Sequence, residues 1–246
     1  MAAHASPDVG TVLQQRYRLD ALCGRGRLGA VFEAHDLALA ESVAVKVFDP
    51  SLFTGPDRSL NTFRTSRVLA YRHDHVARVT DVHVGARPPF IVSQLARGAQ
   101  SFDAFVRGRG IVQNWEIIEL FRQFDGAFEF LHRFGAHGNL HPGNVLILEG
   151  RRVLLTDAYH LVGGASADPI RTLFWAPEQR QNPAADDPAS DIWALGLLLG
   201  MALVRTPVHP GVRLSAQGPG IPYEADAVFL RATEPDPRRR FGSVRE

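Results

Sequence analysis

Two neighbouring stretches, GRGRLGAV at residues 24–31 and SVAVKVF at residues 42–48, decide the fold of this 246-residue chain. The first contains the pattern G-x-G-x-x-G-x-V, whose glycines let backbone amides come close to phosphate oxygens. Residues 30–34 predict another strand, whereas a dinucleotide-binding turn requires its third glycine to open a helix. The two stretches therefore predict a strand-loop-strand lid over a nucleotide, with Lys46 as the charge for its phosphates, and a purely structural turn is the alternative for the glycine pattern.

The overall composition excludes several other classes of protein. Lys and Arg total 27 and Asp and Glu total 26, so the net charge of +1 gives no general attraction to nucleic acid or to anionic lipid. Lys46 is the only lysine, which indicates a strong arginine bias, and chance retention is the alternative to a functional role. The single cysteine, Cys23, excludes an internal disulfide and favours a reducing, cytoplasmic location. The longest apolar run, residues 192–204, is shorter than the roughly 20 residues of a membrane span, so we expect no membrane contact within this segment.

The pattern of apolar residues changes along the chain. Short β-prone runs separated by turns dominate the first ninety-odd residues, and helical spacing within residues 57–71 predicts one helix among them. Beyond residue 98 the pattern is helical: Asn114 is expected to cap a long buried helix, and either Asp187 or Ser190 a second one that ends near Val204. We therefore expect an α+β protein in two lobes. The predicted boundaries are an N-terminal extension at 1–16, an antiparallel sheet with one helix at 17–96, and a mostly helical lobe at 97–246.

Several further strings follow in a fixed order. They are FIVSQL at 90–95, HGNLHPGNVL at 137–146, DAY at 157–159, APE at 176–178, SDIWALG at 190–196, and DP at 236–237 followed by Arg240. Together with the glycine-rich stretch and Lys46, this succession resembles the protein kinase superfamily, in particular the bacterial serine/threonine kinases. The resemblance covers nearly the whole chain. It implies one bilobal kinase-like domain over residues 17–246, in which Arg240 pairs with Glu178.

The resemblance also implies ATP and Mg²⁺ as cofactors. Asn144 and Asp157 match the family positions that coordinate magnesium, although Asn144 as a loop cap and Asp157 as the end of a strand are the structural alternatives. The positions that match the nucleotide-binding residues are Gly24, Gly26, Gly29, Val31, Ala44, Lys46, Gln94 and Ala96.

Two positions of the transfer machinery depart from the family pattern. Asn139 stands where the family has a catalytic aspartate, and a neutral carboxamide cannot act as a general base. The loss of such a base costs about 10²- to 10⁴-fold in rate. His141 replaces a lysine that neutralises the transferring phosphate, and an unperturbed imidazole is mostly uncharged at neutral pH.

Other departures concern regulation. Arg64 occupies the place of the helix glutamate that pairs with the strand lysine in the family. Ala158 and Tyr159 replace the phenylalanine and glycine of the D-F-G motif, which predicts a stiffer activation segment. Gly138 replaces the arginine that grips a phosphorylated activation loop, so activation through that contact is not expected.

These departures favour a pseudokinase: a domain that binds ATP and magnesium, transfers little or no phosphate, and acts as a nucleotide-sensitive scaffold for a protein partner of unknown identity. The alternative is an enzyme with a rearranged site, either a slow or atypical ATP-dependent serine/threonine kinase or another ATP-using transferase. A phosphate-transfer assay discriminates between the two hypotheses.

Overall fold

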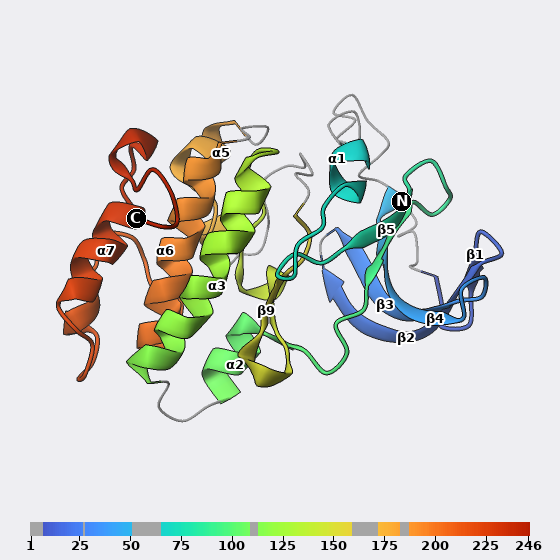
Figure 1. Ribbon diagram of the computed structural model, residues 1–246, viewed down its shortest axis with the longest axis horizontal. Coiled ribbons are helices and arrows are strands. Elements are labelled where there is room, and N and C mark those ends of the chain that lie inside the picture. The colour runs from blue at the N-terminus through green and yellow to red at the C-terminus, as the bar shows by residue number, and fades with distance from the viewer. Residues whose placement is uncertain (1–6, 27, 51–64, 109–112, 159–171, 183–186) are drawn as a thin grey trace, which may run out of the picture. The chain divides into compact units, whose positions relative to one another are not determined.

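The computed structural model describes residues 7–26, 28–50, 65–108, 113–158, 172–182 and 187–246 (Figure 1). The described chain divides into two compact units. Unit 1 holds the described residues up to Arg72 and the segment Ala77–Arg97, and unit 2 holds His73–Val76 and the described residues from Gly98 onward.

Unit 1 is built around a six-stranded sheet in the order β1-β2-β3-β4-β6-β5, in which every neighbouring pair is antiparallel. The sheet confirms the antiparallel lobe predicted from the sequence, and its two-residue strand β1 is an addition to that prediction. Most of the predicted helix at 57–71 lies outside the described residues, and its described part is α1. The elements are β1 (Val12–Leu13), β2 (Tyr17–Gly26), β3 (Gly29–Asp36), β4 (Glu41–Phe48), α1 (Thr65–Leu69), β5 (Val79–His83) and β6 (Phe90–Gln94).

The two faces of this sheet differ in burial. Successive side chains of a strand point to opposite faces, so strict alternation of apolar residues buries one face and leaves the other accessible. On β3 and β4 the buried face carries Ala30, Phe32, Ala34, Val43, Val45 and Val47. The opposite face carries Val31, Glu33, Ala44 and Lys46, all only half-buried. A slip of one residue would exchange the two sets, so the core fixes which face presents Lys46.

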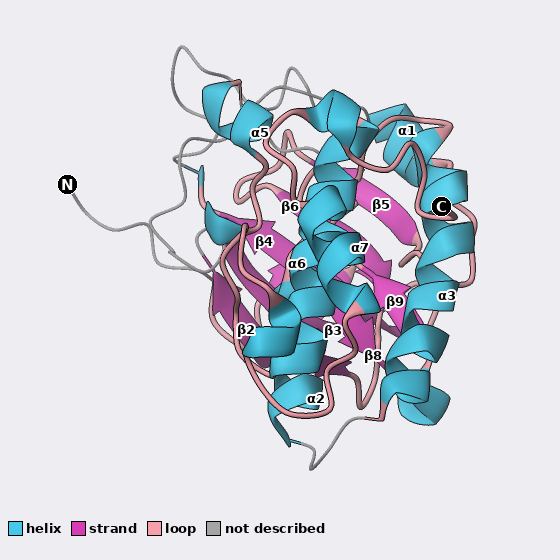
Figure 2. Cartoon of the chain, turned by 90° about the vertical axis from the view of Figure 1, so that its left-hand side faces the viewer, coloured by secondary structure: helices cyan, strands magenta, loops and turns pink. Residues whose placement is uncertain are grey.

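Unit 2 consists mainly of helices, of which α3, α6 and α7 are the longest. Figure 2 shows α6 and α7 packed together, and α3 also contacts α6. No helix in the described ranges is both long and apolar enough to cross a membrane. The elements are β7 (Gln100–Ser101), α2 (Phe102–Gly108), α3 (Asn114–His132), β8 (Val145–Ile147), β9 (Val153–Leu155), α5 (Pro177–Gln181), α6 (Pro188–Val204) and α7 (Glu224–Ala232).

The structure shows which residues cap the N-termini of α6 and α3. Asp187 is the N-cap of α6, because its Oδ1 accepts the N–H of Ala189 at 2.9 Å. The prediction of Asn114 as the cap of α3 is wrong by one residue: Gln113 is the N-cap, and its N–H donates to Glu116 Oε2 at 2.8 Å. The carboxylate three residues into the helix satisfies the cap backbone, which moves the start back from Asn114.

An ion pair between the buried Arg240 and the half-buried Glu178 joins three segments of unit 2. Arg240 is 3% exposed, and its two terminal nitrogens donate to the Glu178 carboxylate at 2.6 and 2.8 Å. The same guanidinium donates to the carbonyl of Ala189 at 2.8 Å, which links α5 and α6 to the C-terminal residues. The predicted pairing of Arg240 with Glu178 is confirmed.

Gly29 and Gly26 provide a matched test of the hairpin between β2 and β3. Gly29 has φ +138°, and a Cβ there would lie 1.9 Å from Val47 O, whereas a Cβ on Gly26 would meet nothing within 4 Å. We expect Gly29→Ala to lower the free energy of unfolding by about 2 kcal/mol or more and Gly26→Ala to change it by less than about 0.5 kcal/mol, as measured by urea denaturation. Equal losses in the two variants would show that the backbone contact does not hold this hairpin.

Candidate functional site

The half-buried face of β3 and β4 gathers three of the predicted nucleotide-binding residues. Val31 is the cross-strand partner of Lys46, and Glu33 that of Ala44. Directly opposed side chains in an antiparallel pair have Cβ atoms about 5 Å apart, so Val31 and Lys46 are neighbours on this face. The Lys46 Nζ lies 5.7 Å from the centroid of the Phe48 ring. The face thus combines a small apolar surface, suited to a base, with one ammonium group.

The three glycines of the loop have different roles. Gly24 pairs with Val31, and Gly26 with Gly29, at the end of the β2–β3 hairpin where the two strands are joined. The fold requires Gly29 because of the backbone of β4, as described above. Gly24 and Gly26 have open space where a side chain would stand. Since the described protein does not itself require glycine at these two positions, the space over their backbone is available for close approach of a ligand.

The other two predicted residues are Gln94, the last residue of β6, and Ala96 in the segment that follows. The N–H of Gln94 donates to Arg78 O at 2.8 Å, and its side chain is exposed. A base that contacts Gln94 through the backbone would therefore use its carbonyl oxygen. No sequence pattern pointed to Arg97, which donates to Glu33 Oε1 at 2.9 Å and to Ser42 Oγ at 2.8 Å and so ties this segment to β3 and β4.

In unit 2, a single buried carboxylate holds the loop between α3 and β8. Asp191 is 1% exposed and accepts the N–H of His137 at 2.7 Å and that of Gly138 at 3.0 Å. It also accepts His132 Nε2 at 3.0 Å, and because a carboxylate only accepts, this nitrogen is the donor. Gly138, where the family has arginine, adopts φ +71°. The signal for Asp191 was present in the sequence, since it is the only charged residue of the apolar helix α6.

Asn139 and His141, at the two degenerate transfer positions, lie on this anchored loop. The carbonyl of Asn139 accepts Asn144 Nδ2 at 2.8 Å. His141 Nδ1 accepts the N–H of Gly143 at 3.1 Å, and a Cβ on Gly143 would lie 3.0 Å from His141 Cε1. With Nδ1 occupied as an acceptor, the neutral imidazole carries its proton on Nε2. His141 is thus a neutral donor packed against its own loop, where the family has a mobile ammonium group.

The predicted metal-binding pair lies at one end of the β8–β9 hairpin. Val145 pairs with Leu155, and the N–H of Thr156 donates to Asn144 O at 2.9 Å, so the positions of Asn144 and Asp157 follow from the same pairing. Asn144 is 5% exposed. Because its Nδ2 donates to the backbone of the loop, its Oδ1 is turned the other way and can serve as a ligand.

Asn144 and Asp157 fit a magnesium ion that is shared with nucleotide phosphates better than a metal ion bound only by protein side chains. Across the described parts of the chain, no group of three or more His, Cys, Asp or Glu is placed to hold an ion. Mg²⁺ in nucleotide sites is bound by one or two carboxylates, and waters and phosphate oxygens fill the other positions. One aspartate and one amide oxygen can provide the protein ligands of such a site. The role of Asn144 and Asp157 in metal binding stays a prediction.

Asp157 stores local strain at this position. Its φ is +57°, in the left-handed region that only a small share of residues other than glycine adopt. Such conformations cluster at functional sites, where the surroundings enforce them. The next residue, Ala158, is buried. Tyr159 and Arg64 lie outside the described residues, so the predictions about them stay as they are.

His137 lies in the interior, as predicted for the loop. It is fully buried, and its Nδ1 accepts the N–H of Asn139 at 3.3 Å. Burial lowers the pKa of His137, an effect that the charges of Asp191 and Asp157 oppose in part. The ring is therefore a neutral packing element of the loop.

Comparison with known proteins gives the family. A sequence model described as "Protein kinase domain" matches residues 17–218. The chain is 27% identical, over 92% of its length, to serine/threonine-protein kinase PknE of Mycobacterium bovis, and 30% identical, over 78% of its length, to PknA of Mycobacterium tuberculosis. It spans about half the length of these curated relatives, covering 44% and 48% of them. Because both relatives are named as serine/threonine kinases, they favour the enzyme alternative over the pseudokinase hypothesis.

Solved structures agree with the fold. A crystal structure of the kinase domain of Mycobacterium tuberculosis PknI, in a form with one cysteine changed to alanine, superimposes with a TM-score of 0.81 at 22% sequence identity, over 98% of this chain and 96% of that one. At this identity the likeness bears on the fold alone. The bilobal kinase-like fold predicted from the sequence is confirmed, and with the family match over residues 17–218 the chain belongs to the protein kinase family.

Proposed function

We propose that this chain is an ATP- and Mg²⁺-dependent serine/threonine kinase domain that transfers phosphate slowly because Asn139 replaces the catalytic carboxylate. The single observation that carries the proposal is the intact anchoring of the catalytic loop by Asp191, with the Asn144 amide oriented by the same loop. This network fixes the backbone path of the loop, so the positions of Asn139 and Asn144 are held although the Asn139 side chain carries no carboxylate. The serine/threonine kinase relatives support the same conclusion.

The geometry of unit 1 supports the proposed nucleotide binding. The apolar side chains of Val31 and Ala44 would contact the base, and the Lys46 ammonium would contact phosphate as a point charge. The open backbone at Gly24 and Gly26 would let their amides approach the phosphate oxygens. The hinge carbonyl of Gln94 and the backbone of Ala96 would hold the base edge.

Phosphate binding and transfer depend on the loop of unit 2. Asn144 Oδ1 and Asp157 would hold magnesium, which when bound neutralises charge on the phosphate oxygens. His141 would donate one neutral hydrogen bond from Nε2 to a phosphate oxygen, a weaker stabilisation than that of an ammonium. Asn139 can orient the substrate hydroxyl but cannot take its proton, so the proton must leave to solvent or to the phosphate.

The proposed function includes a domain organisation and a cellular compartment. We regard residues 17–246 as one kinase-like domain with its lobes divided between residues 96 and 97, preceded by an extension at 1–16. The only cysteine, Cys23, is an exposed free thiol, which supports a reducing, cytoplasmic setting. A protein is the expected substrate or partner.

A second candidate function is a pseudokinase scaffold that binds ATP without transferring phosphate. Two observations favour it. The base position holds an amide, and the imidazole of His141 is held against Gly143 by its own loop. In this case nucleotide occupancy would alter binding of a protein partner, which requires a different affinity of the nucleotide for two conformations.

Nucleotide binding is tested by thermal and chemical unfolding with ATP and Mg²⁺. At about 100 times its dissociation constant, ATP should stabilise the fold by roughly 2.7 kcal/mol. We expect Lys46→Ala to abolish most of this gain and Asp157→Asn to abolish its dependence on Mg²⁺. Glu224→Gln, on the exposed start of α7, is the matched control and should keep the full gain. Absence of any gain in the unmodified protein would contradict both candidate functions.

Phosphate transfer is tested by restoring the missing base. We expect Asn139→Asp to raise the rate of transfer from radiolabelled ATP to a generic protein substrate by about 10²- to 10⁴-fold, because a carboxylate then accepts the hydroxyl proton. Asn182→Asp makes the same chemical change at an exposed position and should leave the rate unchanged. If the unmodified protein and Asn139→Asp are both inactive while ATP still binds, the scaffold function is the correct one.

A further inference from the structure

Four residues of the chain belong to unit 2 although the residues on both sides belong to unit 1. The segment His73–Val76, here called the 73–76 segment, follows Arg72 and precedes Ala77, which are parts of unit 1. It connects α1 to β5 along the chain. The chain therefore passes from unit 1 into unit 2 and back into unit 1 within these four residues.

Backbone contacts with β9 fix the segment. The N–H of Leu155 donates to His75 O at 2.8 Å, and Val76 forms a parallel bridge with Leu155. Val76 is buried. The Leu155 amide is thus a direct reporter of whether the segment is attached.

The two histidines of the segment are held in opposite tautomers. His75 Nδ1 lies 2.9 Å from Val153 O, and because a carbonyl only accepts, this nitrogen carries the proton. His73 Nδ1 lies 3.2 Å from the backbone nitrogen of His75, which only donates, so His73 Nδ1 is a bare acceptor and the neutral ring carries its proton on Nε2. A proton on Nδ1 of His73 would therefore break its hydrogen bond with the His75 N–H.

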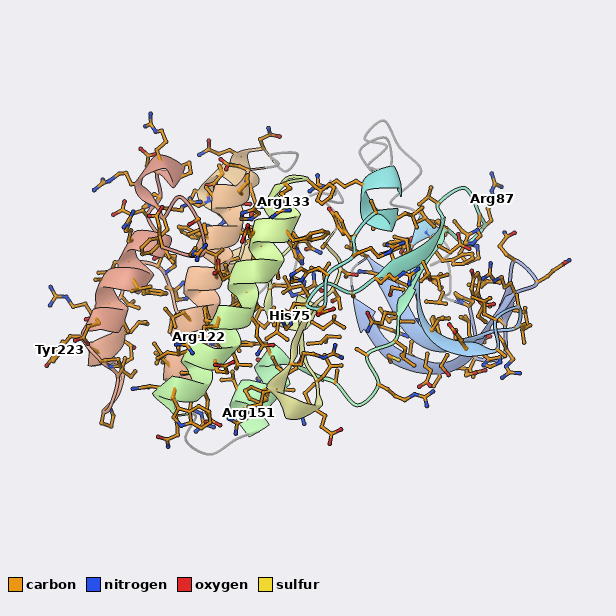
Figure 3. The ribbon with its side chains drawn as sticks, viewed as in Figure 1. His75, Arg87, Arg122, Arg133, Arg151 and Tyr223 are labelled. Atoms are coloured by element: carbon orange, nitrogen blue, oxygen red, sulfur yellow. The ribbon has the colours of Figure 1, made fainter. Side chains whose placement is uncertain are left out.

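The His73 ring is also packed against α3. It stacks on Phe130 with ring centroids 5.4 Å apart and an angle of 23°, and its Nε2 would lie 3.6 Å from a Cβ on Gly126. The His75 ring, labelled in Figure 3, is 5.7 Å from the His73 ring. A charge on His73 would therefore form beside a second imidazole and against an aromatic face.

We propose that the 73–76 segment is a pH-sensitive latch, in which protonation of His73 releases its hydrogen bond to His75 and loosens the attachment of the segment to α3 and β9. A proton on Nδ1 would place two N–H groups against each other, so the local turn must open. The segment would then lose its register with Leu155.

The groups around His73 shift its pKa in opposite directions. Partial burial, followed by the neighbouring His75, lowers the pKa of His73, while Asp74 opposes them. On α3, Asp125 directly precedes Gly126 and Glu129 directly precedes Phe130, the two residues that lie against the His73 ring. Glu129 forms a salt bridge with Arg133 at 3.2 Å. On β9, the residues that contact the segment, Val153 and Leu155, are apolar.

The sign of the pH effect follows from the lowered pKa. The folded protein binds the proton on His73 less readily than the unfolded chain, so protonation favours the open form. The stabilisation that neutral His73 gives to the closed form is fully present above about pH 6.5, the ordinary pKa of histidine. This stabilisation is lost as the pH falls through the lower pKa of the folded state.

Hydrogen exchange followed by NMR tests the latch without any need for catalysis. We expect the protection factor of the Leu155 amide, corrected for intrinsic exchange, to fall by roughly threefold or more between about pH 7.5 and 5.5, while amides within α6 keep theirs. His73→Asn keeps a side-chain acceptor for the His75 N–H but does not titrate, and should abolish the fall. His209→Asn, at an exposed position, should preserve it. An unchanged Leu155 amide in the native protein, or an equal fall in His73→Asn, would overturn the proposal.

The native protein offers a test that needs no variant. Imidazole ¹⁵N shifts near neutral pH should show the proton on Nε2 of His73 and on Nδ1 of His75, and the Leu155 amide signal should follow the titration of His73. A proton on Nδ1 of neutral His73, or a titration at or above the ordinary histidine value, would refute the latch.

Discussion

The site of unit 2 depends on one buried negative charge, the carboxylate of Asp191. A charge removed from water is costly unless strong donors surround it, and here two backbone N–H groups and an imidazole N–H converge on it at 2.7 to 3.0 Å. Because two of the three donors are the backbone of the catalytic loop, satisfying Asp191 fixes the path of that loop. The buried helix α6 therefore sets the start of the loop that carries Asn139 and Asn144.

This constraint does not depend on the side chain of Asn139. The hydrogen bonds that shape the loop go to backbone atoms, so replacing a carboxylate by the amide of Asn139 leaves the loop intact. His141 likewise replaces a cation without disturbing the fold, since its ring caps the turn at Gly143. In the proposed function, binding and transfer are thus separable: Asn139 and His141 lower the expected rate, while Asn144 and Asp157 are the proposed magnesium ligands.

Much of this arrangement was predictable because it follows from local patterns. Short β-prone runs indicated the sheet, helical spacing of apolar residues indicated the helical lobe, and Arg240 pairs with Glu178 as the ordered motifs implied. Contacts made across long separations by residues with no local signature, such as Arg97 with Glu33, could not be predicted. The cap at Gln113 was missed because a carboxylate at Glu116, rather than a side chain at the cap itself, satisfies the helix start. The attachment of His73 to α3 likewise arises only in the folded chain.

The central claim is that the anchored loop still supports transfer of phosphate to an alcohol. The most direct measurement is mass spectrometry of a serine- and threonine-containing peptide library incubated with the unmodified protein, ATP and Mg²⁺, beside the same reaction with Lys46→Ala. We expect slow but measurable accumulation of phosphoserine or phosphothreonine that is absent with Lys46→Ala. No phosphopeptide above the level of the Lys46→Ala reaction, under conditions in which ATP binding is demonstrated, would contradict the claim.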